Sequence, residues 1–164
     1  MNIAERIERS VYRIVNPFMK ALLRSRLHGI ASENIAILHF RGHKSGRQFV
    51  TPLSYVREGA TVSLLSAHST HWWKNLREEG TPVSIEIARE TYTGKARLWD
   101  GDSEALRDRV RRYLSALPRD AKVYGIKLDE NRAPVEASLA KTAPDLVFVE
   151  VELDDPGTGE RPRG

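Results

Sequence analysis

Residues that could bind an anion are concentrated in the stretch Gly42–Leu53, Gly-His-Lys-Ser-Gly-Arg-Gln-Phe-Val-Thr-Pro-Leu. Lys44 and Arg47 supply two cations and Ser45 supplies a hydroxyl. The two glycines allow a tight turn and a close approach of the backbone to a ligand. Such a turn can hold a phosphate or a carboxylate. Taken alone, the stretch is equally well explained as an ordinary basic hairpin.

A second stretch with potential chemistry is His71-Trp72-Trp73-Lys74-Asn75-Leu76. Trp72 and Trp73 are adjacent, so on a helix they point to different sides, and one could pack in the core while the other forms the wall of a cleft. Asn75 supplies a planar hydrogen-bond donor and acceptor. Two core tryptophans are the alternative, because large aromatic side chains are mostly buried.

Other common chemistries find little support in the sequence. His68 and His71 are three residues apart, and His39 and His43 are four apart, but a metal site needs a third ligand and neither pair has one nearby. We therefore predict no metal site. Ser45 does not stand in a Gly-x-Ser-x-Gly elbow, and its surroundings lack the Gly-x-x-x-x-Gly-Lys-Ser/Thr order of a nucleotide phosphate loop.

Composition is that of an ordinary globular protein. The 164 residues suggest one domain, with 40% hydrophobic and 29% charged residues. The absence of cysteine excludes disulfides, a thiolate nucleophile and cysteine-ligated zinc or iron–sulfur sites. No apolar run reaches the roughly 18 residues of a membrane span, and no signal-peptide pattern is present. We expect a cytoplasmic protein.

The net charge of +4 is confined to the N-terminal part of the chain, where residues 1–28 carry six Lys or Arg and two Glu. The remaining residues balance, which argues against a domain built to bind nucleic acid. Residues 3–27 have helical spacing of apolar residues, with a break near Pro17. This N-terminal helical segment (1–30) is either a membrane-surface or lid helix, or a helix packed on the body of the protein.

The middle and end of the chain predict a series of short strands. Their apolar residues alternate and turn signals separate them. The predicted strands are Ile35–Phe40, Phe49–Arg57, Thr61–Ser66, Val83–Ala88, Tyr92–Trp99 and Leu146–Leu153. A helical piece at 71–79 interrupts the series. This pattern favours a small antiparallel barrel over a parallel sheet.

A helix follows the fifth strand. Asp102 is the predicted N-cap and Pro118 the predicted stop. Its predicted buried face consists of Leu106, Val110, Tyr113, Leu114 and Leu117. Residues 119–134 are predicted to be irregular, with a short helix at Val135–Lys141. We predict one domain over residues 1–153 and a disordered tail over 154–164.

Taken in order, three motifs that follow an apolar strand resemble the deazaflavin-dependent nitroreductase family, also called F420-dependent quinone reductases. They are Gly-x-Lys-Ser-Gly-Arg-x-x-x-Thr-Pro-Leu at 42–53, Leu-Leu-Ser-Ala at 64–67 and Trp-Trp-Lys-Asn-Leu-Arg at 72–77. The resemblance covers about residues 16–99 well and the last third weakly. The sequence departs from the family at His43 and Phe49, where the family has arginines, and in a shorter loop at 66–70 that lacks glycines.

The resemblance implies an α+β, mainly β, fold: a six-stranded antiparallel split β-barrel with an N-terminal helix and a helix after strand five. It implies an oxidoreductase that transfers a hydride from reduced coenzyme F420 to a quinone or nitro compound, with FMN as the alternative cofactor. A non-catalytic split-barrel protein that binds FMN, haem or an apolar ligand is the alternative function. The expected partner is a small-molecule electron acceptor, the protein being a monomer or homodimer that could touch a membrane through residues 1–28.

The same resemblance implies roles for particular residues. Lys44, Ser45, Gly46 and Arg47 would hold the anionic tail of the coenzyme, and Thr51 and Pro52 would line the next part of the groove. The deazaflavin ring would lie along Leu65, Ser66 and Ala67. Trp73 and Asn75 would close the site. Tyr124, and after it Tyr55, would face the substrate.

Overall fold

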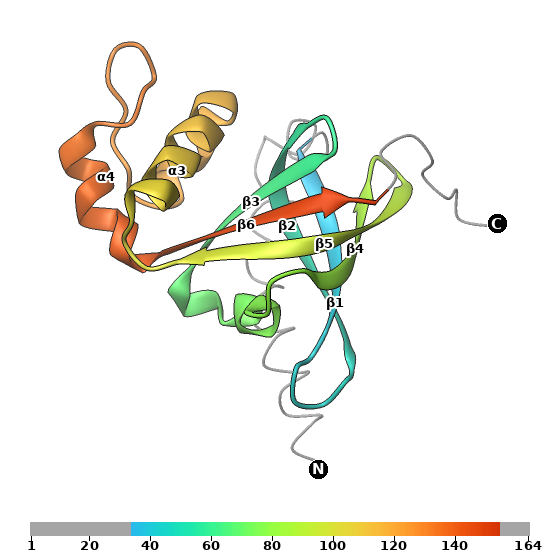
Figure 1. Ribbon diagram of the computed structural model, residues 1–164. Coiled ribbons are helices and arrows are strands. Elements are labelled where there is room, and N and C mark those ends of the chain that lie inside the picture. The colour runs from blue at the N-terminus through green and yellow to red at the C-terminus, as the bar shows by residue number, and fades with distance from the viewer. Residues whose placement is uncertain (1–33, 155–164) are drawn as a thin grey trace.

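Six antiparallel strands close into a barrel in the computed structural model, which describes residues 34–154 (Figure 1). Around the barrel the strand order is β1-β2-β3-β6-β5-β4. The strands are β1 (Ile35–Arg41), β2 (Gln48–Glu58), β3 (Thr61–Ala67), β4 (Thr81–Ile87), β5 (Glu90–Asp100) and β6 (Leu146–Leu153). The predicted six-stranded barrel is therefore confirmed.

The strand ends differ little from the prediction, and the differences have a simple cause. β6 has its predicted bounds, whereas β4 and β5 each begin two residues earlier than predicted. Their first residues are polar or proline, so they lack the apolar alternation, but backbone pairing such as Pro82 with Lys95 includes them. Pro82 is tolerated because β4 pairs with β1 only through Ser84–Glu86, beyond the proline.

Two apolar cores flank the barrel wall. Alternate residues of the strands, such as Ala36, Leu38 and Phe40 of β1, point into the barrel. The second core lies between the outer face of the barrel and the helices, and Leu65 and Phe148 belong to it. In Figure 1 the helices α3 and α4 lie to one side of the barrel, away from the β1–β2 loop.

Helix α3 (Glu104–Ala116) buries its predicted face but begins differently from the prediction. Ser103, rather than Asp102, is the N-cap: its Oγ accepts a hydrogen bond from the Leu106 N–H at 3.2 Å. Asp102 instead accepts two hydrogen bonds from Arg107, each 2.7 Å long. A bidentate contact with a guanidinium is stronger than a neutral cap, so the carboxylate takes that partner.

The remaining helical segments are short. The predicted helix at 71–79 is replaced by two 3-10 turns, η1 (His68–Thr70) and η2 (Trp72–Leu76), separated by His71 in a left-handed conformation (φ 61°). The stretch predicted to be irregular contains a further 3-10 turn, η3 (Pro118–Lys122). The predicted short helix is α4 (Glu136–Thr142), and η4 (Ala143–Asp145) leads from it into β6.

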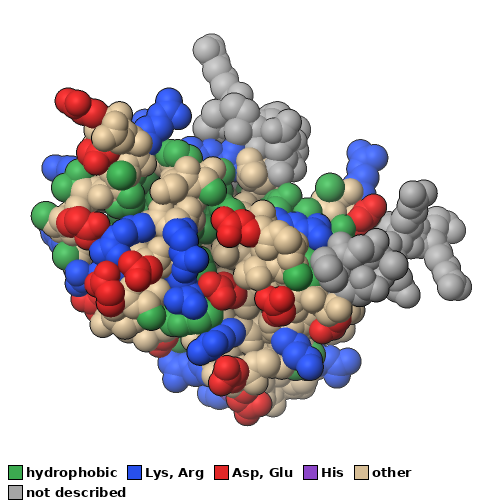
Figure 2. All heavy atoms as spheres, turned by 45° about the horizontal axis from the view of Figure 1, so that its top comes forward, with side chains coloured by type: hydrophobic (Ala, Val, Ile, Leu, Met, Phe, Trp, Pro, Cys, Tyr) green, Lys and Arg blue, Asp and Glu red, His purple; other side chains and the backbone are tan. Residues whose placement is uncertain are grey.

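The predicted N-terminal helix and the predicted disordered tail fall on residues 1–33 and 155–164, outside the described residues, so the single-domain prediction for 1–153 stays a prediction. Over the range 34–154, no helix has both the length and the hydropathy to cross a membrane. On the face shown in Figure 2, acidic and basic side chains are interspersed and form no patch of one sign.

Candidate functional site

The anion-binding stretch forms the connection between β1 and β2, a tight hairpin loop closed by its own backbone. The Gly42 N–H donates to the Arg47 carbonyl and the Gly46 N–H donates to the Gly42 carbonyl, both at 2.8 Å. Gly46 adopts φ +67°, which favours glycine. Lys44, Ser45 and Arg47 are exposed on this loop. The loop therefore presents its cations to solvent, as binding of an anion would require.

A side-chain contact ties this loop to η2. Asn75 Oδ1 accepts hydrogen bonds from the backbone N–H of His43 at 3.0 Å and from its Nδ1 at 2.7 Å. Asn75 Nδ2 donates to the Trp72 carbonyl at 2.9 Å. Asn75, predicted to contact the cofactor, is thus occupied in holding the loop, and His43 uses its ring for the same purpose.

Phe49, the other position at which the resemblance predicts an arginine, also anchors the loop. Its ring stacks on Phe40 with 5.7 Å between centroids. Phe40 in turn lies 6.1 Å from Trp72 of η2. His43 and Phe49 therefore make contacts that fix the loop on the barrel.

A cavity of about 550 Å³ opens between the β1–β2 loop and η2, and we call it the cationic pocket. Its charged lining consists of Arg41, Lys44, Lys74, Arg77 and Glu78. Four permanent cations against one carboxylate give the pocket a positive potential, which attracts anionic groups. The sequence motif contained Lys74 and Arg77, but the prediction did not assign them a role, because only the fold brings them beside the loop.

The barrel wall opens between β2 and β3. β2 pairs with β1 from Gln48 to Ser54, but with β3 only from Tyr55 onward. The next residues in register, Ser54 and Leu65, are not paired. Pro52 then lies on the side that faces the opening, and proline cannot donate to a ladder. The β2–β3 ladder therefore ends at this point, and the backbone of β3 from Leu65 onward has no strand partner on this side.

Several predicted cofactor residues near this point are buried. Thr51 and Ser66 are 2% and 3% exposed, and Leu65 is 2% exposed. Ala67 and Pro52 are partly exposed. Among the predicted cofactor residues, those of the β1–β2 loop are therefore exposed, whereas Pro52 and Ala67 are intermediate in exposure.

The tryptophan prediction needs correction. Trp72 and Trp73 are both buried, so neither forms the exposed wall of a cleft, and the alternative of two core tryptophans is correct. Trp72 Nε1 donates to Ser66 Oγ at 3.1 Å, and Ser66 Oγ also lies 2.9 Å from Thr70 Oγ1. The pair supports the end of β3 from within the barrel.

The two candidate tyrosines lie in different cores. Tyr55 packs against the barrel core, and burial raises the pKa of its hydroxyl. Tyr124 packs against the helix-side core, and its hydroxyl donates to the Leu65 carbonyl at 2.7 Å. Burial, followed by the charge of Asp120, raises the pKa of Tyr124. The structure does not bring the two hydroxyls together, and Tyr124 is bonded to the strand edge.

Two histidines lie beside carboxylates. His68 Nε2 contacts Asp100 Oδ1, and its ring stacks on Trp73 with 5.1 Å between centroids. His39 lies 4.0 Å from Glu86. In the part of the chain that the structure describes, no group of three His, Asp or Glu side chains is placed to hold a metal ion.

Asp120 is a buried carboxylate that the sequence analysis did not single out. It is 6% exposed and accepts a hydrogen bond from the Tyr113 hydroxyl at 2.8 Å. The Ser54 side chain also lies close to this carboxylate. Burial raises the pKa of Asp120, while these contacts and Arg119 oppose the rise. The signal in the sequence was weak: one aspartate in a polar stretch whose partners are distant along the chain.

No curated protein matches the chain. Among solved structures, it is similar to an F420-H2 dependent reductase (FDR-A), with 19% identity and a TM-score of 0.50 over 73% of this chain and 94% of that chain. It is also similar to the FAD and heme binding protein from Mycobacterium smegmatis, with 13% identity and a TM-score of 0.52 over 82% and 68%.

A protein of unknown function from Agrobacterium tumefaciens is similar at 17% identity, with a TM-score of 0.53 over 85% of this chain and 60% of that one. These structural likenesses show a shared fold. The sequence goes further, because residues 11–136 match the family described as F420H(2)-dependent quinone reductase. This match spans most of the sequence, and the chain belongs to the F420H2-dependent quinone reductase family.

Proposed function

We propose that this protein uses the β1–β2 loop and the opening between β2 and β3 to bind reduced F420 and to pass its hydride to a quinone or nitro compound. The observation that carries the proposal is the exposed pair Lys44 and Arg47 on a loop fixed beside a positively charged pocket. Members of this family are F420H2-dependent oxidoreductases, and the substrate is a small molecule.

The residues at the loop suit the anionic tail of F420. Lys44 has no ion-pair partner among residues 34–154, so it is available to a ligand. Ser45 and the backbone around Gly46 add hydrogen-bonding groups beside it. Lys74 and Arg77 line the same pocket and lie against the Trp73 ring, at 5.8 and 5.1 Å from its centre. These contacts leave their charges at the surface of the pocket, where phosphate or carboxylate groups bind well.

The opening between β2 and β3 suits the ring. Pro52 and Ala67 would line it, and Leu65 would present its backbone, while Thr51, Ser66 and Trp73 would support it from the barrel interior. When bound, F420 supplies the hydride chemistry. The protein's own task is to hold the tail by charge, to orient the ring against the edge of β3 and to exclude water through the apolar wall.

Titration with F420, followed through the fluorescence of the coenzyme, tests binding. We expect a saturable change, and none at tens of micromolar coenzyme would overturn the proposal. The double variant Lys44→Ala/Arg47→Ala should bind about 10- to 150-fold more weakly for each lost charged contact. Lys141→Ala, on exposed α4, is the control and should bind as the wild type does.

Turnover tests the reaction class. Reduced F420 is mixed with a soluble quinone or a nitroimidazole, and the return of oxidised F420 is followed by absorbance. We expect acceptor-dependent oxidation that needs the protein. Saturable binding of F420, FMN or haem without turnover would instead support the alternative of a non-catalytic binding protein.

A further inference from the structure

The cationic pocket brings together like charges that have no counter-charge in contact. Within residues 34–154, none of its four cations forms an ion pair with a carboxylate. On α3, by contrast, Arg107, Arg109 and Arg111 lie 2.7, 2.9 and 2.8 Å from a carboxylate oxygen. Unpaired like charges repel one another, and an anion that binds among them relieves this repulsion.

One carboxylate, that of Glu78, lines the same pocket. It is exposed, and it forms no ion pair with any residue of the described range. Lys74 and Arg77 precede it in the chain, but they lie over the Trp73 ring, at 5.8 and 5.1 Å from its centre. Glu78 therefore acts on a bound anion as a separate negative charge and does not neutralise one particular cation.

The backbone of Glu78 is held in place by Thr81, which also lines the pocket. Thr81 donates twice to the Glu78 carbonyl, from Oγ1 at 2.6 Å and from its N–H at 3.2 Å. Gly80 adopts φ +77° in this turn, and its N–H donates to the Ala96 carbonyl of β5 at 3.0 Å. The turn thus fixes the Cα of Glu78 beside the pocket, at the start of β4.

The next residue, Glu79, has a different environment. It does not line the pocket, and its Oε1 lies 3.6 Å from Arg97 Nε of β5. Two consecutive carboxylates are therefore directed to different places. Because the interaction of two charges falls with distance, the charge of Glu78 acts on a ligand in the pocket more strongly than that of Glu79.

We propose that Glu78 is a specificity-determining residue that limits how strongly the cationic pocket prefers highly charged anions. Its repulsion grows with each negative charge that the ligand carries. The four cations attract each of those charges as well, so Glu78 reduces the preference for polyanions without reversing it. Such a repulsive group lowers the affinity of competing polyanions for the site. The inference rests on the proposed function for one point, that the anion is the tail of F420.

Glu78→Gln removes the charge and keeps the shape of the side chain. Glu79→Gln is the matched control, since it removes the same charge from the adjacent residue outside the pocket. Isothermal titration calorimetry with phosphate and with tripolyphosphate measures the affinities. Compared with Glu79→Gln, we expect Glu78→Gln to bind phosphate about two- to threefold and tripolyphosphate about five- to tenfold more tightly. Glu78→Asp, which keeps the charge, should bind both anions as the wild type does.

Salt separates an effect of charge from an effect of shape. At about 1 M salt the screening length falls to about 3 Å, so the gain in Glu78→Gln should nearly disappear. A gain that persists at this salt concentration and is equal for the two anions would show a change in the shape of the pocket, and would overturn the proposal.

F420 titration of the same variants connects this result with the coenzyme. Glu78→Gln should bind F420 about two- to tenfold more tightly than Glu79→Gln does. A gain with tripolyphosphate but none with F420 would overturn the placement of the tail in this pocket.

The two proposals can fail separately. A wild-type protein that does not bind F420 overturns the proposed function, whereas the comparison with tripolyphosphate still decides the role of Glu78. If Glu78→Gln and Glu79→Gln bind tripolyphosphate equally, or if the wild type binds neither inorganic anion, the role of Glu78 is wrong even where F420 binds.

Discussion

Gly42 stands where the chain leaves β1 and has no room for a side chain. A Cβ at this position would lie 2.6 Å from Cε2 of Phe49 and 2.8 Å from Oγ of Ser45. We expect Gly42→Ala to lower the free energy of unfolding by about 1–3 kcal/mol through overpacking. Displacement of Ser45 should also weaken F420 binding. Urea unfolding and F420 titration of the same preparation measure both effects.

Gly59→Ala separates crowding from backbone strain. Gly59 adopts φ +60°, but nothing lies within 4 Å of a Cβ added there. Its replacement should cost about 1 kcal/mol of stability and leave F420 affinity unchanged. Equal F420 affinity in the two alanine variants would contradict the placement of the ligand tail at the β1–β2 loop.

Individual contacts show where sequence-based prediction of the site reaches its limit. Lys44 and Arg47 were predicted as ligands from their glycine-flanked spacing, which is a local property, and this stays a prediction. Asn75 was assigned to the cofactor, but it bonds to His43, 32 residues away. The hydroxyl of Tyr124 was expected to face a substrate, but it donates to the Leu65 carbonyl. The fold determines these hydrogen-bond partners, and the spacing of residues in the sequence does not indicate them.

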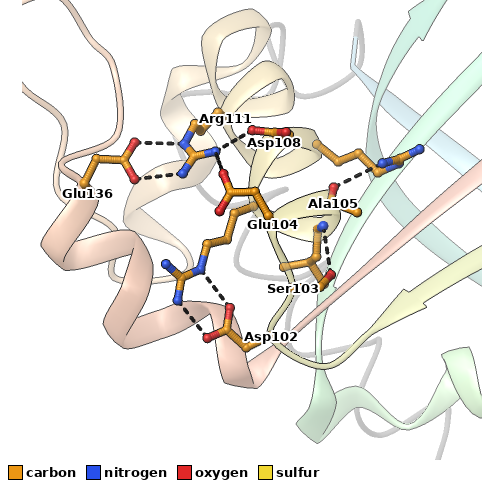
Figure 3. A network of polar contacts seen from close by, with 10 residues as sticks. Asp102, Ser103, Glu104, Ala105, Asp108, Arg111 and Glu136 are labelled. Atoms are coloured by element: carbon orange, nitrogen blue, oxygen red, sulfur yellow. Dashed lines mark hydrogen bonds and ion pairs between the residues drawn. The ribbon is translucent and has the colours of Figure 1, made fainter.

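At the scale of elements, α3 and α4 are joined by an ion-pair network (Figure 3). Arg111 donates to both carboxylate oxygens of Glu136 at 2.8 Å and to Glu104 at 2.9 Å. The hydrogen bonds from Arg111 lower the pKa of Glu136, and the carboxylates raise the pKa of Arg111 in turn. The network thus fixes α4 on α3, the helix that also anchors Asp120.

The lowered pKa of Glu136 predicts a direction for the pH dependence of stability. An acid whose pKa is depressed in the folded state stabilises the fold above its ordinary value of 4.5, and this contribution is lost as the pH falls through the depressed value. Wild type should therefore be more stable than Glu136→Gln at pH 7, and the difference should shrink below pH 4.5. Urea unfolding at several pH values measures it.

Glu130→Gln makes the same change on an exposed loop residue and serves as the control. The difference in the free energy of unfolding between Glu130→Gln and the wild type should stay small at every pH. A stability difference in Glu136→Gln that did not vary with pH would show that the carboxylate contributes through shape and not through charge.

The elements themselves were largely predictable, and the exceptions have physical causes. Strands with one buried face reveal themselves by alternation, which is why β6 was found with its true bounds. The start of α3 was misplaced by one residue because Asp102 and Ser103 are both good caps, and only the position of Arg107 decides between them. The helical piece predicted at 71–79 is present only as the 3-10 turn η2 over Trp72–Leu76, and the apolar pattern did not show the left-handed His71 just before it.

At the scale of the whole molecule, the barrel followed from the number and spacing of the strands, whereas the cationic pocket did not. The β2–β3 ladder ends before Ser54 and Leu65, and the Leu65 carbonyl accepts a hydrogen bond from Tyr124, 59 residues away. The cationic pocket likewise joins two segments that are separate in the sequence. The fold class is thus set by local patterns, and the site is set by where distant segments meet.

Binding of F420 across the loop, the pocket and the groove should stabilise the entire domain. A ligand at 100 times its Kd adds about 2.7 kcal/mol to the free energy of unfolding. For a chain of this length that raises the Tm by about 5–10 °C. Thermal unfolding with and without F420 measures the shift, and an unchanged Tm at saturating F420 would count against the proposed function.

The size of that shift should depend on salt, because the proposed contacts to the tail are ionic. Raising the ionic strength from about 0.1 M to about 1 M shortens the screening length from about 10 Å to about 3 Å, so the shift at a fixed F420 concentration should fall. Lys44→Ala/Arg47→Ala should show a smaller shift that responds less to salt, since it lacks the two charges being screened. Because the groove would still receive the ring, a residual shift should remain in that variant at low salt.

FMN carries a single phosphate and should stabilise the wild type less than F420 does. Equal Tm shifts with F420 and FMN that do not depend on salt would mean that the loop cations do not bind the F420 tail.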